Sequence, residues 1–490
     1  MPSILGANSV SGYDVSNSIY INRSAGGRLA KTFSSGQTDR QKNTVSMWVK
    51  RCRLTTGSGT GHQVLFSNQD NDQIGFDGET DQLRFVSAGT MKVRTNRVFR
   101  DTAAWYHIVF AMDTTQGTGS NRIKFYVNGV QETSFQTYTD VNQNTNHSFF
   151  IQQDHDIGRS HSDANRHYDG YICEMHGIDG QQLDASYFGE TNDNGVWVPK
   201  KYTGTYGNNG FFLQFKQTGT SADASGKGAD TSGNGHHFDD TSIDVEDIKT
   251  DTCTNNFATL IDAPNMNVRV GNLKAETSRT GNWDRVHSSI GVTSGKWYFE
   301  VKASRTEDNF RVIGGVAGNP EKFTILFNGK GASGDPLSTF SNTYPFYGKG
   351  VWLSHWYDED YNDSSTASVQ SNNDILQFAL DMDNYKLWIG INGQFKDNSN
   401  NTVSYADVAA GNSATVSIAS AAYTGKTFFP AFWLRDDEGA DDNLADINFG
   451  GAISFNISSA VADTAGRGKF EYTVPSGYYA LCTKNLAAVG

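Results

Sequence analysis

The stretch Asn121–Val130, NRIKFYVNGV, decides the fold class of this chain. Its apolar residues Ile123, Phe125 and Val127 alternate with Arg122, Lys124 and Tyr126, and an Asn-Gly pair follows. A period of two places every second side chain on one face of a strand. Asn-Gly is typical of the two-residue turn of a β-hairpin. The stretch therefore predicts an antiparallel hairpin with one buried face.

The same alternation recurs elsewhere, in residues 296–302 (KWYFEVK) and 386–393 (KLWIGING). No long segment carries the i, i+3, i+4, i+7 stripe of an amphipathic helix. Short alternating strands separated by turn residues about every ten positions are typical of antiparallel β-sandwiches. We therefore predict an all-β protein built from tandem antiparallel β-sandwiches.

A short sequence motif occurs twice and suggests that the chain has two related parts. Residues 110–131 and residues 378–394 both read Phe-Ala-x-Asp, a turn, a strand and Asn-Gly-x. Between them, residues 191–262 are rich in Gly, Asn, Asp, Thr and Ser, which is typical of a connector. The apolar run at 210–215 (GFFLQF) predicts one strand that returns to the first sandwich. We predict a first sandwich over 1–190, a connector over 191–262 and a second sandwich over 263–490.

The charge balance excludes several classes of partner. The 490 residues carry 53 acidic and 40 basic side chains, a net charge of −13. A nucleic-acid-binding protein needs a basic face, and so does a protein that docks on an anionic membrane. We also expect no signal peptide, because the first residues lack a basic segment followed by an apolar one. No run of apolar residues is long enough for a membrane-spanning helix.

The four cysteines are far apart in sequence, and no CxxC occurs. This spacing argues against a cysteine zinc site. We expect Cys52, Cys173, Cys253 and Cys482 to be buried free thiols.

Two families share motifs with the two halves of the chain. The first half contains SMWVKR (46–51), AWYHIVFAMD (104–113), RIKFYVNGVQ (122–131), IGRS (157–160) and YDGYICEM (168–175). In that order they resemble a laminin-G/concanavalin-A-like jelly roll. The second half contains SGKWYFEV (294–301), VIGGVAGN (312–319), ILQFALDMDNYKLWIGINGQ (375–394), FFPAFWL (428–434) and DINFGG (446–451). These resemble a SPRY domain.

The chain as a whole resembles tailed-phage virion proteins of the tail fibre and structural type. The shared stretches are KKYTGTYGNNGFFLQF (200–215), DTSGNGHHF (230–238), TNNFATL (254–260) and SGYYALCTKNL (476–486). The resemblance implies a multicopy component on the surface of a particle, with other virion proteins as partners. Heptads and collagen-like repeats, which trimerise typical fibres, are missing, and no N-terminal anchor module is evident.

The sequence lacks the usual catalytic signatures, including GxSxG, HExxH and GxxxxGK[ST]. It also lacks an E-x-D-x-x-E strand, which would direct a pair of carboxylates into the cleft of a sandwich glycosidase. Asp381 and Asp383 are two apart but read as turn residues. We therefore predict a protein that is not an enzyme.

Calcium is the one cofactor that the sequence brings forward. It binds about six to eight oxygens, many of them from loop carboxylates. Acidic stretches occur at 70–81, 358–363 and 436–446, and a set of solvated acidic loops is the alternative interpretation. The candidate ligands are Asp70, Asp72, Asp358, Asp360, Asp436 and Asp437.

Residues 154–169 (DHDIGRSHSDANRHYD) carry His155, His161 and His167 among four aspartates. A six-residue spacing does not converge on one strand face. We expect a solvent-exposed polar loop, with a transition-metal site as the alternative.

An aromatic group in the second half is the candidate ligand-binding site. It comprises Trp352, His355, Trp356, Tyr357 and Tyr361, beside acidic residues. Aromatic faces near carboxylates suit sugar stacking or a protein hot spot, and packing in the core is the alternative.

From these observations we predict a non-catalytic virion structural protein. The first interpretation is a tail fibre or tail-tip adhesin that binds a host-surface glycan or protein. The alternatives are a capsid decoration or head-fibre protein that stabilises the shell, a glycan-degrading enzyme on a sandwich scaffold, and a cellular SPRY adaptor. Fold alone does not choose among them.

Overall fold

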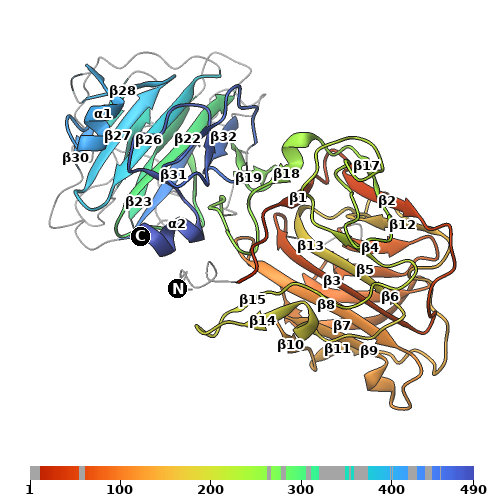
Figure 1. Cartoon of the computed structure of the whole chain (residues 1–490). Coiled ribbons are helices and arrows are strands. Elements are labelled where there is room, and N and C mark those ends of the chain that lie inside the picture. The colour runs from red at the N-terminus through yellow and green to blue at the C-terminus, as the bar shows by residue number, and fades with distance from the viewer. Residues whose placement is uncertain are drawn as a thin grey trace. The chain divides into compact units, whose positions relative to one another are not determined.

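The computed structural model describes residues 12–54, 61–261, 266–277, 283–304, 311–318, 348–352, 355–357, 373–397, 399, 401–417, 427–435, 444–452 and 454–490. Its contacts divide the chain into one unit that ends at Asn256 and one that begins at Phe257. Both units consist of sheets that are almost entirely antiparallel, so the prediction of an all-β fold is confirmed (Figure 1).

The first sheet of the N-terminal unit runs in the order β10-β9-β8-β3-β13-β1-β18, with β16 paired to β13. Its strands are β1 (Ser18–Ile21), β3 (Lys42–Arg51), β8 (Trp105–Asp113), β9 (Ile123–Val127), β10 (Val130–Gln131), β13 (Gly170–Asp179), β16 (Phe211–Leu213) and β18 (Ile248–Lys249). The predicted hairpin is β9–β10, with Asn128 at φ 48° and Gly129 at φ 82°. Both angles fit the type I′ turn that the Asn-Gly pair predicts.

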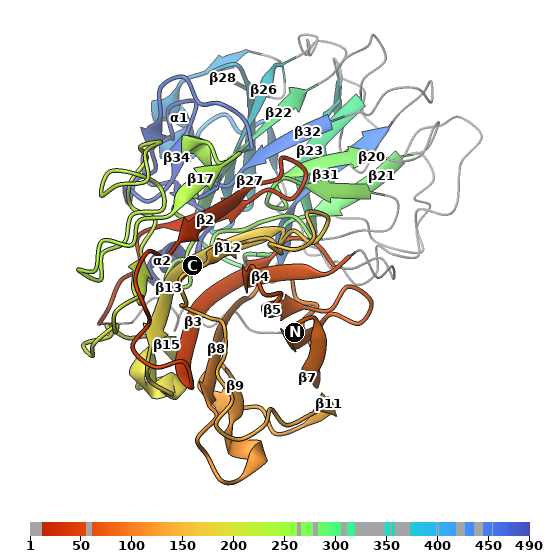
Figure 2. The ribbon, with the colours of Figure 1, turned by 90° about the vertical axis from the view of Figure 1, so that its right-hand side faces the viewer.

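The second sheet of this unit runs in the order β11-β7-β6-β5-β4-β12-β2-β17. Its strands are β2 (Arg28–Thr32), β4 (Gln63–Asn68), β5 (Gln73–Phe76), β6 (Gln82–Ser87), β7 (Thr90–Val98), β11 (Phe135–Tyr138), β12 (Asp154–Ile157) and β17 (Asp239–Thr241). The two sheets form the layers of a sandwich (Figure 2). Side chains such as Val45, Phe85 and Phe110 are fully buried in the core that joins the layers.

The segment that we expected to be a connector belongs to this sandwich as far as Asn256. It contributes β16, β17, β18 and the hairpin of β14 (Gly189–Thr191) with β15 (Trp197–Pro199). The predicted return of residues 210–215 is seen as β16 pairing with β13. A second apolar cluster, which includes Val109, Ile178, Phe188 and Tyr202, lies apart from the main core. These added strands are two or three residues long, too short to show alternation among so many turn residues.

The C-terminal unit contains a sheet in the order β19-β20-β32-β22-β26-β27-β28-β29, to which β30 and β35 add, and a sheet in the order β21-β31-β23-β24-β25. The strands are β19 (Met266–Arg269), β20 (Lys274–Thr277), β21 (Trp283–His287), β22 (Lys296–Ser304), β23 (Arg311–Gly318), β24 (Gly348–Trp352), β25 (His355–Tyr357), β26 (Ile375–Asp381), β27 (Lys386–Ile391), β28 (Gln394–Lys396), β29 (Thr402–Val403), β30 (Val416–Ser417), β31 (Phe428–Arg435), β32 (Leu444–Asn448) and β35 (Tyr479–Ala480). The second predicted hairpin is β27–β28, with its turn at Asn392 and Gly393.

The last residues of the chain are held by two carboxylates. Glu300 on β22 accepts hydrogen bonds from the backbone N–H groups of Glu471 and Tyr472, both at 2.9 Å. Asp463 accepts from the N–H groups of Gly468 and Ala480, also at 2.9 Å. The hairpin β33 (Val461–Ala462) with β34 (Lys469–Phe470) and the strand β35 are thereby fixed to the sheet.

Helices are few and short in the described ranges. They are α1 (Tyr405–Ala410) and α2 (Thr483–Val489), with 3-10 turns η2 (Gly119–Asn121), η3 (Ala185–Tyr187) and η4 (Val245–Asp247). Within the described residues, none of these helices has the length and apolar character needed to cross a membrane.

Candidate functional site

The predicted aromatic site lies at the edge of the second sheet of the C-terminal unit. Trp352 ends β24, and His355, Trp356 and Tyr357 form β25, with Trp352 in register with His355. The backbone therefore brings four of the five predicted residues onto one hairpin. Tyr361 lies outside the described residues, and the ligand-binding role of this group stays a prediction.

The acidic stretch at 70–81 is interrupted by a strand. Asp70 and Asp72 precede β5, whereas Asp77 and Asp81 follow it. The Asp72 carboxylate accepts from the backbone N–H of Ala88 at 2.8 Å, and Asp70 accepts from Gln153 Nε2 at 3.1 Å. These acidic residues are therefore divided between the two ends of β5.

Calcium binding stays a prediction. The other candidate ligands, Asp358, Asp360, Asp436 and Asp437, lie outside the described residues. Among the residues that the structure does describe, no group of three or more His, Cys, Asp or Glu is arranged to hold a metal ion.

Cys52, Cys173, Cys253 and Cys482 are all free and buried, which confirms the expectation of buried free thiols.

The expectation of an exposed loop at residues 154–169 is wrong for its first four residues, which form β12. His155 is fully buried, and its Nε2 accepts from the Phe150 N–H at 3.0 Å. Its ring lies 4.9 Å from that of Phe33, and burial lowers its pKa to about 4. The histidine takes an inward position that an apolar residue usually fills, which is why alternation did not reveal the strand.

Because His155 points into the core, its neighbour Asp156 points outward. The Asp156 carboxylate accepts a hydrogen bond from Arg28 Nη1 at 2.8 Å and is hydrogen-bonded to His161 Nδ1 at 2.7 Å. It is almost fully buried. The segment 158–169 covers this side of the sheet, because Ser67 Oγ on β4 donates to the Arg159 carbonyl at 2.8 Å and accepts from the His161 N–H at 2.9 Å. We call the outer side of the second sheet, together with this covering segment, the polar face.

The polar face continues onto β5 and β6. Gln73 Nε2 donates to Ser160 Oγ at 3.0 Å, and Ser162 Oγ donates to Asn71 Oδ1 at 2.8 Å. Arg84 Nη2 donates to Gln73 Oε1 at 2.8 Å. Amide, hydroxyl and guanidinium groups thus lie side by side, and such groups bind sugar hydroxyls and anionic oxygens.

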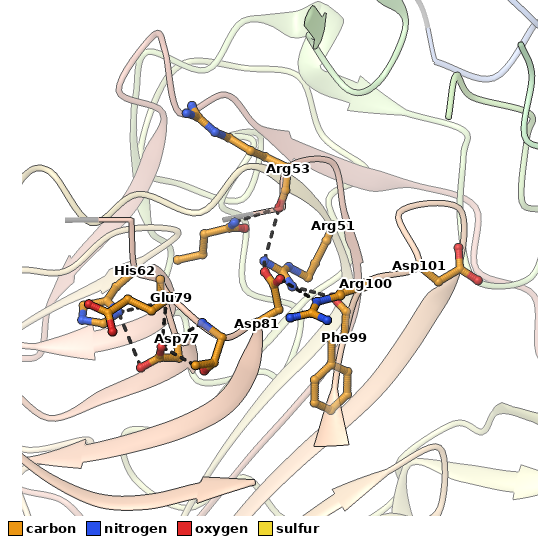
Figure 3. A network of polar contacts seen from close by, with 12 residues as sticks. Arg51, Arg53, His62, Asp77, Glu79, Asp81, Phe99, Arg100 and Asp101 are labelled. Atoms are coloured by element: carbon orange, nitrogen blue, oxygen red, sulfur yellow. Dashed lines mark hydrogen bonds and ion pairs between the residues drawn. The ribbon is translucent and has the colours of Figure 1, made fainter. Parts of the chain in front are cut away.

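The loops at one end of the sandwich are tied by a network centred on Asp81 (Figure 3). Arg51 Nη2 lies 2.9 Å from Asp81 Oδ1, and Arg100 Nε lies 3.1 Å from Asp81 Oδ2. Arg51 also donates to the carbonyl of Phe99 and stacks on the ring of Phe76 at 4.5 Å. The network therefore joins the end of β3 to the turns that follow β5 and β7.

The turn at 77–81 brings this network next to the polar face. Burial opposes ionisation of Asp77, but hydrogen bonds from the Glu79 N–H and the Thr80 side chain, with the charge of Arg94, hold its pKa below the usual range. His62 Nδ1 accepts from the Gly78 N–H at 2.8 Å. Burial, and then the charge of Arg84, lowers the pKa of His62 to about 4, so the ring is neutral at pH 7.

Sequence reasoning did not find the polar face. The available signal was Arg84 in QLRFVS (82–87), where a charged residue sits between the buried Leu83 and Phe85. Alternation along these residues is consistent with an outward side chain, but only the fold shows that Arg94 and residues 158–169 meet it there.

The model of the concanavalin A-like lectin/glucanases superfamily matches residues 25–180, which lie within the N-terminal unit. No curated protein matches the chain.

Three solved structures resemble parts of the chain. The SPRY domain of human HERC1 is 15% identical with a TM-score of 0.25, over 39% of this chain and 94% of that one. The SAP-like pentraxin of Limulus polyphemus is 14% identical with a TM-score of 0.26, over 35% and 80%. A putative carbohydrate binding protein from Bacteroides ovatus is 11% identical with a TM-score of 0.32, over 47% and 58%.

Proposed function

We propose that this chain is a non-catalytic glycan-binding protein whose polar face recognises the sugar. The observation that carries the proposal is the exposed Ser162 hydroxyl bonded to the partly exposed amide of Asn71 on one side of the sheet. A buried network of Gln73, Ser160 and Arg84 holds these two groups in place. The family model names lectins, which supports a binding role for this sandwich. It also names glucanases, but the sequence lacks the strand-borne carboxylate pair that sandwich glycosidases use.

We propose further that the chain is exposed on a virion, where many copies turn weak sugar contacts into avidity. Four stretches that resemble tailed-phage virion proteins support this setting, at 200–215, 230–238, 254–260 and 476–486. Because they lie outside the family match, the shared sandwich fold does not account for them. A tail fibre or tail-tip adhesin that contacts host-surface glycan or protein is our first choice. A capsid decoration protein is the second, favoured by the lack of heptads and collagen-like repeats in the sequence.

A glycan array probed with the full chain tests the binding proposal. Ser162→Trp should weaken every glycan signal by about tenfold or more, because the exposed Ser162 lies on the polar face and a bulky ring there blocks access. Ser186→Trp is the matched control, since Ser186 is also exposed but belongs to η3, away from the polar face. Absence of any glycan signal from the wild-type chain would contradict the proposal.

Immunogold labelling of intact particles tests the setting. Gold at the tail end supports the adhesin, and gold over the head supports the decoration protein. No gold on any particle would contradict the virion proposal while leaving glycan binding to stand on the array. Release of reducing sugar from a bound glycan would contradict the non-catalytic part.

A further inference from the structure

One buried cation of the N-terminal unit is paired differently from its peers. Lys50, Arg51 and Lys227 are fully buried or nearly so, and each has a carboxylate oxygen within 3.0 Å. Arg84 is only 3% exposed, yet among the described residues no carboxylate lies within ion-pair distance of it. Its one hydrogen-bond partner there is the neutral amide of Gln73, and its Nε is buried without a partner.

The neighbours of Arg84 add positive charge. Burial, together with the positive charges of Arg166 and Arg94, lowers the pKa of Arg84 to about 10, although the negative charge of Asp77 opposes them. Asp163 is already bound to Arg166 at 2.9 Å. Asp77 lies 3.6 Å from Arg94 through Oδ2, and its Oδ1 accepts from the N–H groups of its own turn. With His62 neutral, three guanidinium groups face two carboxylates.

This arrangement is costly for the protein alone. A buried charge is tolerated when it is paired, and Arg84 lacks the carboxylate partner that Lys50, Arg51 and Lys227 have. The cluster is nevertheless reachable, because the side chains of Arg94 and Arg166 are 23% and 29% exposed. An incoming anion would meet these two first and then the donors of Arg84.

We infer that Arg84, Arg94 and Arg166 form a subsite for an anionic group, a carboxylate or a sulfate, carried by an acidic glycan. The inference rests on the proposed function, since it names the substrate class of the polar face. Guanidinium groups bind planar or tetrahedral oxoanions through paired N–H donors. The amide of Asn71 and the hydroxyl of Ser162, which are linked through Gln73 to Arg84, lie in place to bind the hydroxyls of the same sugar.

The test uses the full chain and three immobilised polymers at constant ionic strength: polygalacturonate for the carboxylate, dextran sulfate for the sulfate, and dextran as the neutral reference. The variants are Arg94→Gln and Arg166→Gln, whose side chains are partly exposed, and Arg84→Gln. Arg97→Gln is the matched control, because Arg97 is also an exposed, ion-paired arginine of β7, but its carboxylate is Glu132, at 2.7 Å, and not a carboxylate of the Arg84 cluster. Thermal melting of every variant confirms that it is folded.

The wild-type chain should bind at least one anionic polymer and not dextran, with affinity that falls as salt rises. Each of Arg84→Gln, Arg94→Gln and Arg166→Gln should weaken that binding by about tenfold, while Arg97→Gln leaves it within about twofold. The same loss in Arg97→Gln would overturn the inference, because attraction would then be general. Binding of neutral glycans on the array with no effect of Arg94→Gln would overturn the inference and leave the proposed function intact. If the wild-type chain bound no glycan on the array, both the proposed function and this inference would be wrong.

Discussion

Three histidines of the N-terminal unit are buried in uncharged form. His107 lies between the rings of Trp48 and Trp197, at 4.8 and 6.0 Å, and His176 stacks on Phe212 at 4.2 Å. Burial lowers the pKa of His107 and His176 to about 3 and that of His155 to about 4. Below pH 6.5, the ordinary pKa of histidine, these side chains bind protons in the unfolded chain but stay neutral in the folded chain. Each histidine therefore removes stability as the pH falls from about 6.5 toward 4.

Glu174 changes the pH dependence of stability in the opposite direction to the histidines. Its replacement should therefore leave the pH dependence that the histidines cause more clearly visible. Burial raises its pKa to about 7, so the folded chain holds a proton that the unfolded chain releases between about pH 4.5 and 7. This stabilisation is full below pH 4.5 and is lost as the pH rises through 7. In Glu174→Gln, the free energy of unfolding should rise more steeply with pH across that window, by up to about 1.4 kcal/mol per pH unit.

Urea unfolding at several pH values from 4.5 to 7.5 measures this slope. Gln retains an acceptor for the Tyr13 hydroxyl, which donates to Glu174 at 2.9 Å, so the variant should fold. Glu190→Gln, at an exposed position, is the control and should run parallel to the wild type. Parallel lines for Glu174→Gln as well would show that Glu174 is ionised in the folded chain.

At the scale of elements, the last segment of the N-terminal unit is secured by a buried ion pair. Asp251, just after β18, lies 2.9 Å from Lys50 Nζ on β3 and accepts from Trp105 Nε1 at 3.2 Å. Neither charged side chain is exposed. The pair thus connects the end of the unit to the middle of its first sheet.

Asp251→Ala should destabilise the N-terminal unit by about 3–5 kcal/mol, because it leaves the Lys50 ammonium buried without its carboxylate. Chemical denaturation of the full chain, followed by circular dichroism and total tryptophan fluorescence, measures the loss as a shift of the transition of the N-terminal unit. Asp239→Ala, on the exposed side of β17, should change stability by less than about 0.5 kcal/mol. A change of that small size in Asp251→Ala would show that the pair contributes little.

The tail of the C-terminal unit depends on Asp463 in a similar way. Asp463→Ala removes the acceptor of the Gly468 and Ala480 N–H groups and of the Asn485 side-chain amide at 2.9 Å. Unsatisfied buried donors cost about 1–3 kcal/mol each, so the tail should open. Limited proteolysis should then cut between residues 461 and 490 in the variant and not in the wild type. Asp463→Asn, which keeps one acceptor, should be cut at an intermediate rate.

The elements that could be predicted are those whose local signals agree with their packing. The hairpins at 122–131 and 386–396 follow from alternation and Asn-Gly turns, and Asp381 caps its turn by accepting from the Asn384 N–H, as its reading as a turn residue implies. Strand β12 was missed because His155 stands where an apolar residue would mark the core. The polar face was missed because its parts, Arg84, Arg94 and Arg166, are distant in sequence and only tertiary packing brings them together.

At the scale of the whole molecule, the boundary at Asn256 has a direct consequence for isolated pieces of the chain. Residues 1–256 should fold with one cooperative transition. A fragment that stops at residue 190, the boundary expected from the sequence, should be unfolded or aggregated. It lacks β16, β17 and β18 and the buried Tyr202, so it leaves the edge of β1 and the outer apolar cluster uncovered. Circular dichroism melts of the two fragments decide this, and equal stability would place the boundary near 190.

The pairing of β1 with β18 also delays the completion of the first sheet during translation. Ser18 lies opposite Lys249, so the first strand of the chain cannot meet one of its two partners until some 230 further residues have left the ribosome. At roughly 5–20 residues per second, that delay is about 10–50 s. During this interval the nascent chain displays an unpaired apolar edge, which is the kind of surface that chaperones bind. Expression at lower temperature or with added chaperone should therefore raise the yield of folded protein.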